Sequence, residues 1–324
     1  MHSLGELQAI IRKTFDSTSF SREPAELYEP IAYTLNLGGK RIRPLLVLIG
    51  CDLFRGDVEK AGPAILAIEL FHNFTLLHDD IMDRAPIRRG KETVYKKWNT
   101  SVAILSGDTM FALACEHLSQ LDPDILALAL SEFTRTARLV CEGQQYDMNF
   151  ETRERVSLGE YLEMIRLKTA VLIGSSLKLG AILAKAPPAE TAKVFSFGEN
   201  IGMAFQLQDD LLDVFGDEQK FGKETGGDIL SGKKTFLLLK ALEIAPESAR
   251  AELDLCFSDP SIAGEEKIAR VKKVYETLKI REITLEEIGK YFSSALQSCS
   301  GIDADEEGKE VLRSFSLELL KRDF

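Results

Sequence analysis

Paired cysteines, long hydrophobic runs and an excess of basic charge are all missing from this sequence. The cysteines are odd in number, scattered and never arranged as CxxC: Cys51, Cys115, Cys141, Cys256 and Cys299. Such usage predicts neither a disulfide framework nor a zinc site, and it favours a reducing compartment. We therefore expect a cytoplasmic protein.

The charge balance and the apolar segments exclude further classes. The chain has 40 Lys and Arg against 51 Asp and Glu, a formal net charge of −11, which disfavours nucleic acid and anionic membranes as partners. Its start, "MHSLGELQAIIRK", lacks the apolar core of a signal peptide, and Lys178 interrupts the long apolar stretch at 169–184. We expect neither export nor integral membrane association.

What the sequence does contain is helical periodicity. Of its 324 residues 45% are hydrophobic, enough for a sizeable core. Apolar residues recur every three or four positions, as in "PAILAIELFHNFTLLHDD", and alternating strand-like runs bounded by hairpin turns are absent. The breaks between these segments are rich in Gly, Pro, Asp or Ser, and none is long enough for a linker. The pattern predicts an all-α protein with one domain over 1–324 rather than two.

Two short segments place several carboxylates on an apolar helix: "LLHDDIMD" at 76–83 and "LQDDLLD" at 207–213. Each has two aspartates four positions apart and a third beside the first: Asp79, Asp80 and Asp83, then Asp209, Asp210 and Asp213. Residues i and i+4 share a helix face, where like charges destabilise the helix unless a cation joins them. Oxygen ligands favour a hard ion, and Mg²⁺ commonly binds one or two carboxylates together with water and substrate phosphates. The alternative for one such motif is a solvated acidic face.

Basic residues gather in short clusters despite the acidic total. The clusters are "GGKRIRP" with Lys40, Arg41 and Arg43, "RRG" with Arg88 and Arg89, and "GKETGGD" with Lys223. Arginine suits bidentate phosphate contacts, and lysine acts as a point charge. Lys168 lies on an apolar helical stripe, where it either extends outward to solvent or meets an anion. His72 and Gln206 share a helix side with the acidic clusters, although single residues of this kind are more often satisfied core groups.

Taken together, these motifs resemble one family, the trans-polyprenyl (E-isoprenyl) diphosphate synthases of the short-chain type. The resemblance runs in order through "GGKRIRP", "ELFHNFTLLHDDIMDRAPIRRGKETV", "GQQYDM", "LKTA", "FQLQDDLLDVFGD" and "GKETGGDILSGKKT". It implies an isoprenoid-synthase-type helical bundle around a central cavity, usually a homodimer, with the two Asp-rich motifs facing each other across the cavity mouth. It also implies Mg²⁺-dependent head-to-tail transfer between an allylic diphosphate and isopentenyl diphosphate.

The resemblance assigns roles by position. Magnesium would be held by Asp79, Asp83 and Asp209, with Asp80 and Asp213 assisting. The allylic diphosphate would be bound by Arg88, Lys168 and Lys223, and isopentenyl diphosphate by Lys40, Arg43, His72 and Arg89. The place where a carbocation forms would be lined by Thr169 and Gln206, together with the main chain near Lys168. Aspartates and arginines would thus both face diphosphate rather than pair with each other. The only departures are Asn73 after His72 and "RAPI" before Arg88.

Product length is expected to depend on residues one turn before Asp79. An elongating chain grows away from its diphosphate, and residues about 6 to 7.5 Å deeper are Thr75 and Phe74. Helical phase alone does not decide between them, and Phe74 could instead be ordinary core packing. The resemblance adds that an aromatic residue five positions before the first Asp marks short products. It favours geranylgeranyl diphosphate, with farnesyl or a longer polyprenyl diphosphate as alternatives.

Two other functions share parts of this pattern. A terpene cyclase ionises a diphosphate in the same way but needs no site for isopentenyl diphosphate, which would leave Lys40, Arg43 and Arg89 without a role. A non-catalytic partner subunit of a heteromeric synthase typically loses its Asp-rich motifs, and both are intact here. A prenyltransferase is therefore the favoured interpretation.

Overall fold

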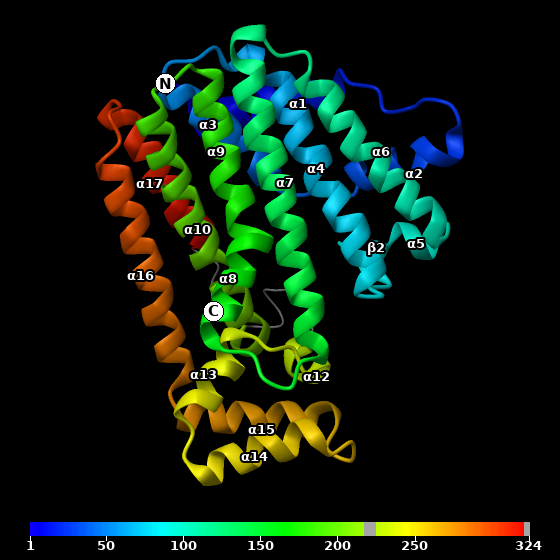
Figure 1. Ribbon diagram of the computed structural model, residues 1–324, viewed down its shortest axis with the longest axis vertical. Coiled ribbons are helices and arrows are strands. Elements are labelled where there is room, and N and C mark those ends of the chain that lie inside the picture. The colour runs from blue at the N-terminus through cyan, green and yellow to red at the C-terminus, as the bar shows by residue number, and fades with distance from the viewer. Residues whose placement is uncertain (217–224, 321–324) are drawn as a thin grey trace. The chain divides into compact units, whose positions relative to one another are not determined.

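The computed structural model describes residues 1–216 and 225–320, and its architecture is all-α, as the periodicity predicts (Figure 1). The chain forms two compact units, each built from discontinuous segments: residues 1–137, 175–194 and 303–311 in the first, and 138–174, 195–302 and 312–324 in the second. The expectation of a single domain over 1–324 stays a prediction.

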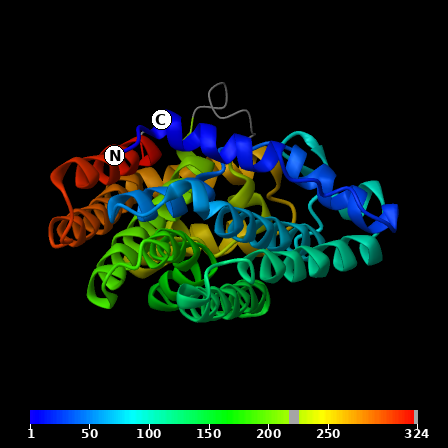
Figure 2. The same cartoon turned by 90° about the horizontal axis from the view of Figure 1, so that it is seen from above.

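Elements of the first unit surround helix α4. They are α1 (Leu4–Asp16), α2 (Ala25–Asn36), α3 (Ile42–Leu53), the 3₁₀ turn η1 (Val58–Ala61), α4 (Gly62–Met82), β1 (Ile87–Arg88), β2 (Lys91–Glu92), α5 (Val94–Lys97) and α6 (Thr100–Leu118). Helix α4 lies beside α3 and α6, and α1 packs on α3 and α4, as Figures 1 and 2 show from two directions. Residues 64–71 of α4 are all buried, which explains its nearly continuous apolar sequence.

Elements of the second unit include α8 (Leu158–Ile165), the π-helical turn η2 (Arg166–Ala170), α12 (Gly227–Ser231), α13 (Phe236–Ile244), α14 (Glu247–Ser258), α15 (Gly264–Thr277) and α16 (Ile280–Ser300). Helices α14 and α15 lie side by side, and α13, α15 and α16 pack on one another. Four helices contribute residues to both units: α7 (Pro123–Thr152), α9 (Val171–Leu183), α10 (Pro188–Phe215) and α17 (Glu306–Leu320).

Glycines allow α3 and α9 to touch within the first unit. A Cβ atom on Gly180 would lie 2.0 Å from the Val47 carbonyl oxygen, and one on Gly50 would lie 2.1 Å from the Leu177 carbonyl oxygen. Any side chain at either position would therefore force the two backbones apart. This close packing fixes α3, which begins at Ile42 within the first basic cluster and carries Arg43 in its first turn.

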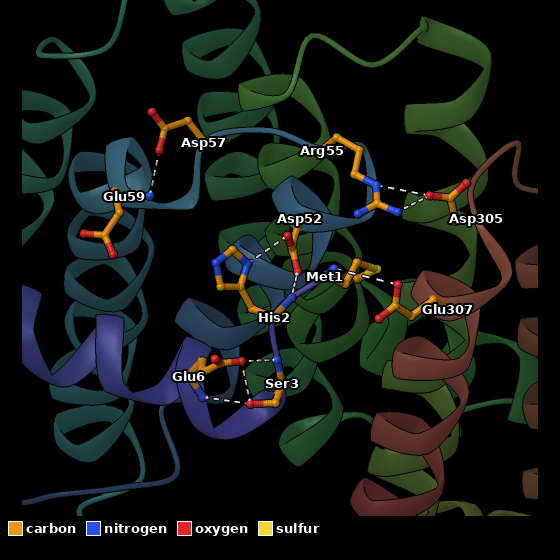
Figure 3. Close-up of polar contacts among 10 residues, drawn as sticks. All are labelled: Met1, His2, Ser3, Glu6, Asp52, Arg55, Asp57, Glu59, Asp305 and Glu307. Atoms are coloured by element: carbon orange, nitrogen blue, oxygen red, sulfur yellow. Dashed lines mark hydrogen bonds and ion pairs between the residues drawn. The ribbon is translucent and has the colours of Figure 1, made fainter.

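Polar contacts attach the start of the chain to this unit (Figure 3). The His2 backbone N–H donates to buried Asp52 of α3 at 2.8 Å, and the His2 ring lies 3.0 Å from the same carboxylate. Ser3 and Glu6 form a capping box that begins α1. Near them, Arg55 binds Asp305. These contacts bring residues distant in sequence against α3.

One short hairpin departs from the sequence expectation of no strands. Ile87 pairs with Glu92 and Arg88 with Lys91, and the turn between them consists of Arg89 at φ +51° and Gly90 at φ +72°. Two left-handed residues make the turn type that matches strand twist, for which glycine at the second position is favourable. Its two-residue strands are too short to give an alternating hydrophobic pattern. The hairpin matters because it carries both arginines of the "RRG" cluster.

Helices of the described residues do not reach the length and apolarity that a membrane crossing requires.

Candidate active site

The first Asp-rich motif occupies the end of α4. Asp79 and Asp80 belong to its last turn, and Asp83 caps it, donating its backbone N–H to the Asp79 carbonyl at 2.8 Å. Asp79 is partly buried and Asp83 is exposed, whereas only 3% of Asp80 is exposed. The outer two carboxylates therefore remain accessible from solvent, and the middle one does not.

Asp80 has a partner within the protein, Arg88 of the hairpin. Both Nε and Nη2 of Arg88 donate to Oδ1 of Asp80 at 2.7 Å. Burial raises the pKa of Asp80, and the Arg88 charge opposes that rise. The expectation that these aspartates and arginines do not pair is wrong for Asp80 and Arg88. A metal-assisting role for Asp80 and a diphosphate contact for Arg88 both stay predictions.

A second polar group of the first unit joins α3 to the middle of α4. Arg43 donates Nη1–H to Nε2 of His72 at 3.1 Å, so that imidazole nitrogen must be unprotonated. Burial lowers the pKa of His72 well below its usual value, with the Arg43 charge acting in the same direction, and burial lowers the pKa of Arg43 to about 10. Nε of Arg43 is buried and has no hydrogen-bond partner within the described residues. This donor is suited to a further anionic oxygen.

Glu69 lies on α4 one turn before His72. Its side chain is buried, and burial raises its pKa while the charge of Arg43 lowers it. Asn73 donates its amide to the Glu69 carboxylate at 3.2 Å and to the Glu69 carbonyl at 2.8 Å. The carboxylate thus offsets the positive charge of Arg43 and is itself held by Asn73. Asn73, which departs from the family pattern, thus holds the Glu69 side chain in place.

Arg89 points toward Gly38 and Gly39, the glycine pair that opens the first basic cluster. Its Nη1 donates to the Gly38 carbonyl, and a Cβ atom on Gly39, whose φ is +137°, would lie 2.9 Å from its Cζ. Gly39 therefore leaves room for the guanidinium group. The charge of Arg89 also influences the pKa values of Glu69 and His72, which places it electrostatically with Arg43. Lys40, beside Gly39, is exposed.

The proposed chain-length residues lie at an aromatic cluster. The ring of Phe74 lies 5.8 Å from Phe71, 5.6 Å from Phe111 and 4.7 Å from the His78 ring. Thr75 turns its hydroxyl back to the His72 carbonyl at 2.8 Å. Phe74 is partly buried and packs against other aromatic rings, which is consistent with ordinary core packing. The role of both residues in product length stays a prediction.

In the second unit, the π-helical turn η2 carries Lys168 and Thr169 between α8 and α9. Nζ of Lys168 lies 2.5 Å from the Asp147 carboxylate of α7, so this lysine meets an anion, as one of the two alternatives expected. Close backbone packing holds the turn, because a Cβ on Gly143 would lie 2.3 Å from the Lys168 nitrogen and one on Gly202 would lie 2.6 Å from the Ala170 Cα. π-turns inside helices frequently mark functional sites.

The second Asp-rich motif lies in the last turns of α10. Asp209 and Asp213 are partly buried, and Oδ2 of Asp213 accepts the Asp228 backbone N–H at 2.9 Å. Gly226 makes this possible by turning the chain at φ +87° and donating its own N–H to the Asp213 carbonyl at 2.6 Å. Burial, followed by the charge of Asp213, raises the pKa of Asp228 to about 6. The sequence interpretation did not include Asp228, although it lies in the same "GGD" as the third basic cluster.

The middle aspartate of this motif, Asp210, is buried and belongs to a chain of hydrogen bonds. Thr169 donates Oγ1–H to Oε1 of Gln206 at 3.0 Å, and Gln206 donates Nε2–H to Oδ1 of Asp210 at 3.1 Å. The hydroxyl of Tyr161 donates to Oδ2 of the same carboxylate. Burial raises the pKa of Asp210 to about 7, although both hydrogen bonds oppose the rise. The predicted pair of Thr169 and Gln206 is therefore in direct contact.

These donors fit magnesium as a partly hydrated ion. No group of three or more His, Cys, Asp and Glu side chains in residues 1–216 and 225–320 forms a closed metal site. Magnesium is usually bound by one or two carboxylates, with water and substrate phosphates as the remaining ligands. Asp79 with Asp83, and Asp209 with Asp213, are accessible oxygen pairs of this kind. Lys223, the last predicted ligand of the allylic diphosphate, lies outside the described residues.

Comparison with known proteins decides the family. The polyprenyl synthetase family model matches residues 24–278. The chain belongs to the polyprenyl synthetase family. It is 37% identical over 317 residues to the geranylgeranyl pyrophosphate synthase of Geoglobus acetivorans, covering 97% of this chain and 96% of the relative. A crystal structure of a geranylgeranyl pyrophosphate synthase, 44% identical, superposes with a TM-score of 0.93 over 100% of both chains. Another, from Pyrococcus horikoshii Ot3, is 31% identical with a TM-score of 0.90 over 99% of this chain and 98% of the other.

As a polyprenyl synthetase, the chain is a prenyltransferase with the all-α isoprenoid synthase fold, and both predictions are confirmed. The structure adds five residues to which the sequence analysis gave no role: Glu69, Asp147, Tyr161, Asp210 and Asp228. Each is an acidic or hydroxyl group beside a predicted site residue. Glu69 could have been found as an acidic residue one turn before His72, and Asp147 as the acidic residue of "GQQYDM". Tyr161 gave no such signal, because its spacing is that of an apolar stripe.

Proposed function

We propose that this polyprenyl synthetase condenses isopentenyl diphosphate with an allylic diphosphate in the presence of Mg²⁺ and releases geranylgeranyl diphosphate. The observation that carries the proposal is the pair of Asp-rich motifs, each with accessible outer carboxylates. Similarity to synthases named for geranylgeranyl pyrophosphate supports the product. The protein would act as a homodimer in the cytoplasm, by analogy with the family.

Basic residues would divide the two substrates between them. Arg43, with its unpartnered Nε, would bind the diphosphate of isopentenyl diphosphate together with Arg89. Neutral His72 orients Arg43, and exposed Lys40 adds a further charge. The allylic diphosphate would be bound by Arg88, Lys168 and Lys223. Because Arg88 and Asp80 form an ion pair and Lys168 and Asp147 form another, both cations are held ready at fixed positions.

Ionisation of the allylic carbon–oxygen bond is the first chemical step. Asp79 with Asp83 in the first motif, and Asp209 with Asp213 in the second, would hold Mg²⁺, whose charge would offset the negative charge that develops on the leaving diphosphate. Arg88 and Lys168 would stabilise the same charge directly. The electron pair of the bond leaves with the diphosphate, and the carbonyl oxygen of Gln206 and the hydroxyl oxygen of Thr169 would stabilise the allylic cation that remains.

Bond formation completes the transfer. The double bond of isopentenyl diphosphate attacks the cation, and a new carbon–carbon bond forms. Loss of a proton from the carbon next to the resulting cationic centre then restores an alkene. The released diphosphate would accept that proton. Apolar walls, including the aromatic cluster of Phe74, would exclude the water that could otherwise quench the cation.

The product assay separates this function from its alternatives. Purified protein alone would be incubated with Mg²⁺, isopentenyl diphosphate and dimethylallyl, geranyl or farnesyl diphosphate, and the products separated by chromatography after dephosphorylation. We expect the twenty-carbon alcohol as the main product from each primer. A main product of fifteen carbons, or of more than twenty, would show that the chain-length assignment is wrong. Cyclic hydrocarbons formed without isopentenyl diphosphate would indicate a cyclase, and no product would indicate a partner subunit.

A further inference from the structure

Two buried side chains beside the second Asp-rich motif have no part in the reaction as described above. Only 3% of Tyr161 and 5% of Asp210 is exposed. Tyr161 belongs to α8, and Asp210 belongs to α10, yet the Tyr161 hydroxyl donates directly to the Asp210 carboxylate. A buried carboxylate is costly, so its retention at this place calls for a physical use.

The hydrogen bonds in this group define how the side-chain amide of Gln206 is turned. The Asp210 carboxylate accepts a hydrogen bond at each of its oxygens, and the side chain of Gln206 turns its NH₂ group to Oδ1, at 3.1 Å. The opposite end of the same amide, Oε1, then faces Thr169 at 3.0 Å. Tyr161 occupies Oδ2, and because burial raises its pKa well above the usual value, its hydroxyl keeps the proton that it donates.

The orientation of Gln206 has a chemical consequence. The oxygen of an amide is the negative end of its dipole and the NH₂ group is the positive end. Turned as observed, the amide offers its oxygen on the side of Thr169, where it stabilises positive charge. Turned by half a rotation, it would offer N–H groups there and destabilise the same charge.

We propose that Tyr161 and Asp210 are positioning residues that lock the amide of Gln206 with its carbonyl oxygen toward Thr169, the orientation that stabilises an allylic cation. The inference rests on the proposed function, because Gln206 and Thr169 stabilise a cation only in that reaction. Tyr161 and Asp210 themselves touch neither substrate. They act through Gln206, Asp210 by selecting the amide end and Tyr161 by holding the carboxylate.

The kinetic test is a double-mutant cycle. Tyr161→Phe and Asp210→Asn should each lower kcat about tenfold, the equivalent of one hydrogen bond to a charged group, with the KM of both substrates changed less than about twofold. In a Gln206→Leu background, Tyr161→Phe should lower kcat by less than about twofold further, because its effect passes through Gln206. Equal tenfold losses in both backgrounds would overturn the inference. Tyr275→Phe, which alters a buried tyrosine of α15 outside this group, is the matched control and should leave kcat unchanged.

A second measurement tests the hydrogen bonds from Tyr161 to Asp210 and from Gln206 to Asp210 without requiring turnover. The NMR ¹H–¹⁵N signal of the Gln206 side chain can be assigned by its loss in Gln206→Leu. The Asp210 carboxylate should shift this signal downfield, so it should move upfield in Asp210→Asn and in Tyr161→Phe. It should not move in Tyr275→Phe. An unchanged signal in both variants would overturn the inference even if wild-type turnover is normal. If the wild type forms no prenyl product, the proposed function fails, and this signal still tests whether Tyr161 and Asp210 hold the amide.

Discussion

The two Asp-rich motifs have the same spacing, but their buried middle aspartates have different hydrogen-bond partners. Asp80 of the first unit binds a guanidinium group through two nitrogens, whereas Asp210 of the second unit accepts hydrogen bonds from a hydroxyl and an amide. Burial raises the pKa of both carboxyls, but only Asp80 has an opposite charge that strongly opposes the rise. The inner aspartate of each motif therefore organises neighbouring side chains, while the outer aspartates remain at least partly exposed.

The outer aspartates should therefore have the largest effect on turnover. Asp79→Asn and Asp209→Asn each keep the shape of the side chain and remove a charge from the predicted metal ligands, so kcat should fall by about a thousandfold or more. Steady-state product formation at saturating Mg²⁺ measures this, with circular dichroism to establish that the fold is intact. Near-normal rates in both variants would contradict a shared role for the two motifs.

The adjacent arginines provide a test within the first unit. Arg88 is directed to Asp80, and Arg89 to Gly38, so the two should serve different substrates. Arg88→Ala should raise KM mainly for the allylic diphosphate, and Arg89→Ala mainly for isopentenyl diphosphate. Each lost charged contact should cost roughly 1.5–3 kcal/mol, a factor of about 10 to 150 in KM. Varying one substrate at a time separates the effects, and equal changes for both substrates in both variants would reject the division.

Phe74→Ala should change product length rather than diphosphate binding. Removing the ring opens the aromatic cluster, so product chains longer than twenty carbons should appear while KM for both diphosphates stays within about twofold. The truncation should also cost about 3–5 kcal/mol of unfolding free energy, because Phe74 is packed against Phe71 and Phe111. Chromatography of the products decides the matter, with Phe71→Leu as a packing control. A folded, active variant with unchanged product length would show that Phe74 is core packing only.

Glu69 should give the smallest effect, a pH-dependent change in stability. Its pKa is raised in the folded state above the unfolded value of about 4.3, so the folded form binds the proton more tightly. The stability that this provides is complete below pH about 4.3 and is lost as pH rises through the folded-state value. Relative to wild type, Glu69→Gln should therefore become progressively more stable as pH rises across that window. Urea unfolding from pH 4 to 8 measures the difference, and a difference that does not vary with pH would refute a raised pKa.

Much of this arrangement follows from the sequence, for identifiable reasons. Helical periodicity and the two Asp-rich motifs predict the fold class and the outer aspartates, because both depend on local spacing. The pairing of Asp80 with Arg88 could not be predicted, because it requires the chain to turn directly after α4, where Arg84 has φ +52°, so that β1 comes back to Asp80. Tyr161 was also missed, since a tyrosine on an apolar stripe does not reveal that its hydroxyl meets a carboxylate from another helix.

The most direct test of metal-dependent prenyl transfer is incorporation of labelled isopentenyl diphosphate by the purified wild-type protein. The protein would be freed of divalent ions with EDTA, supplied with an allylic diphosphate, and assayed before and after addition of excess Mg²⁺. The account predicts no labelled prenyl product with EDTA and its formation once Mg²⁺ is added. Product formed equally well without a divalent cation, or no product with Mg²⁺ and both substrates present, would contradict it.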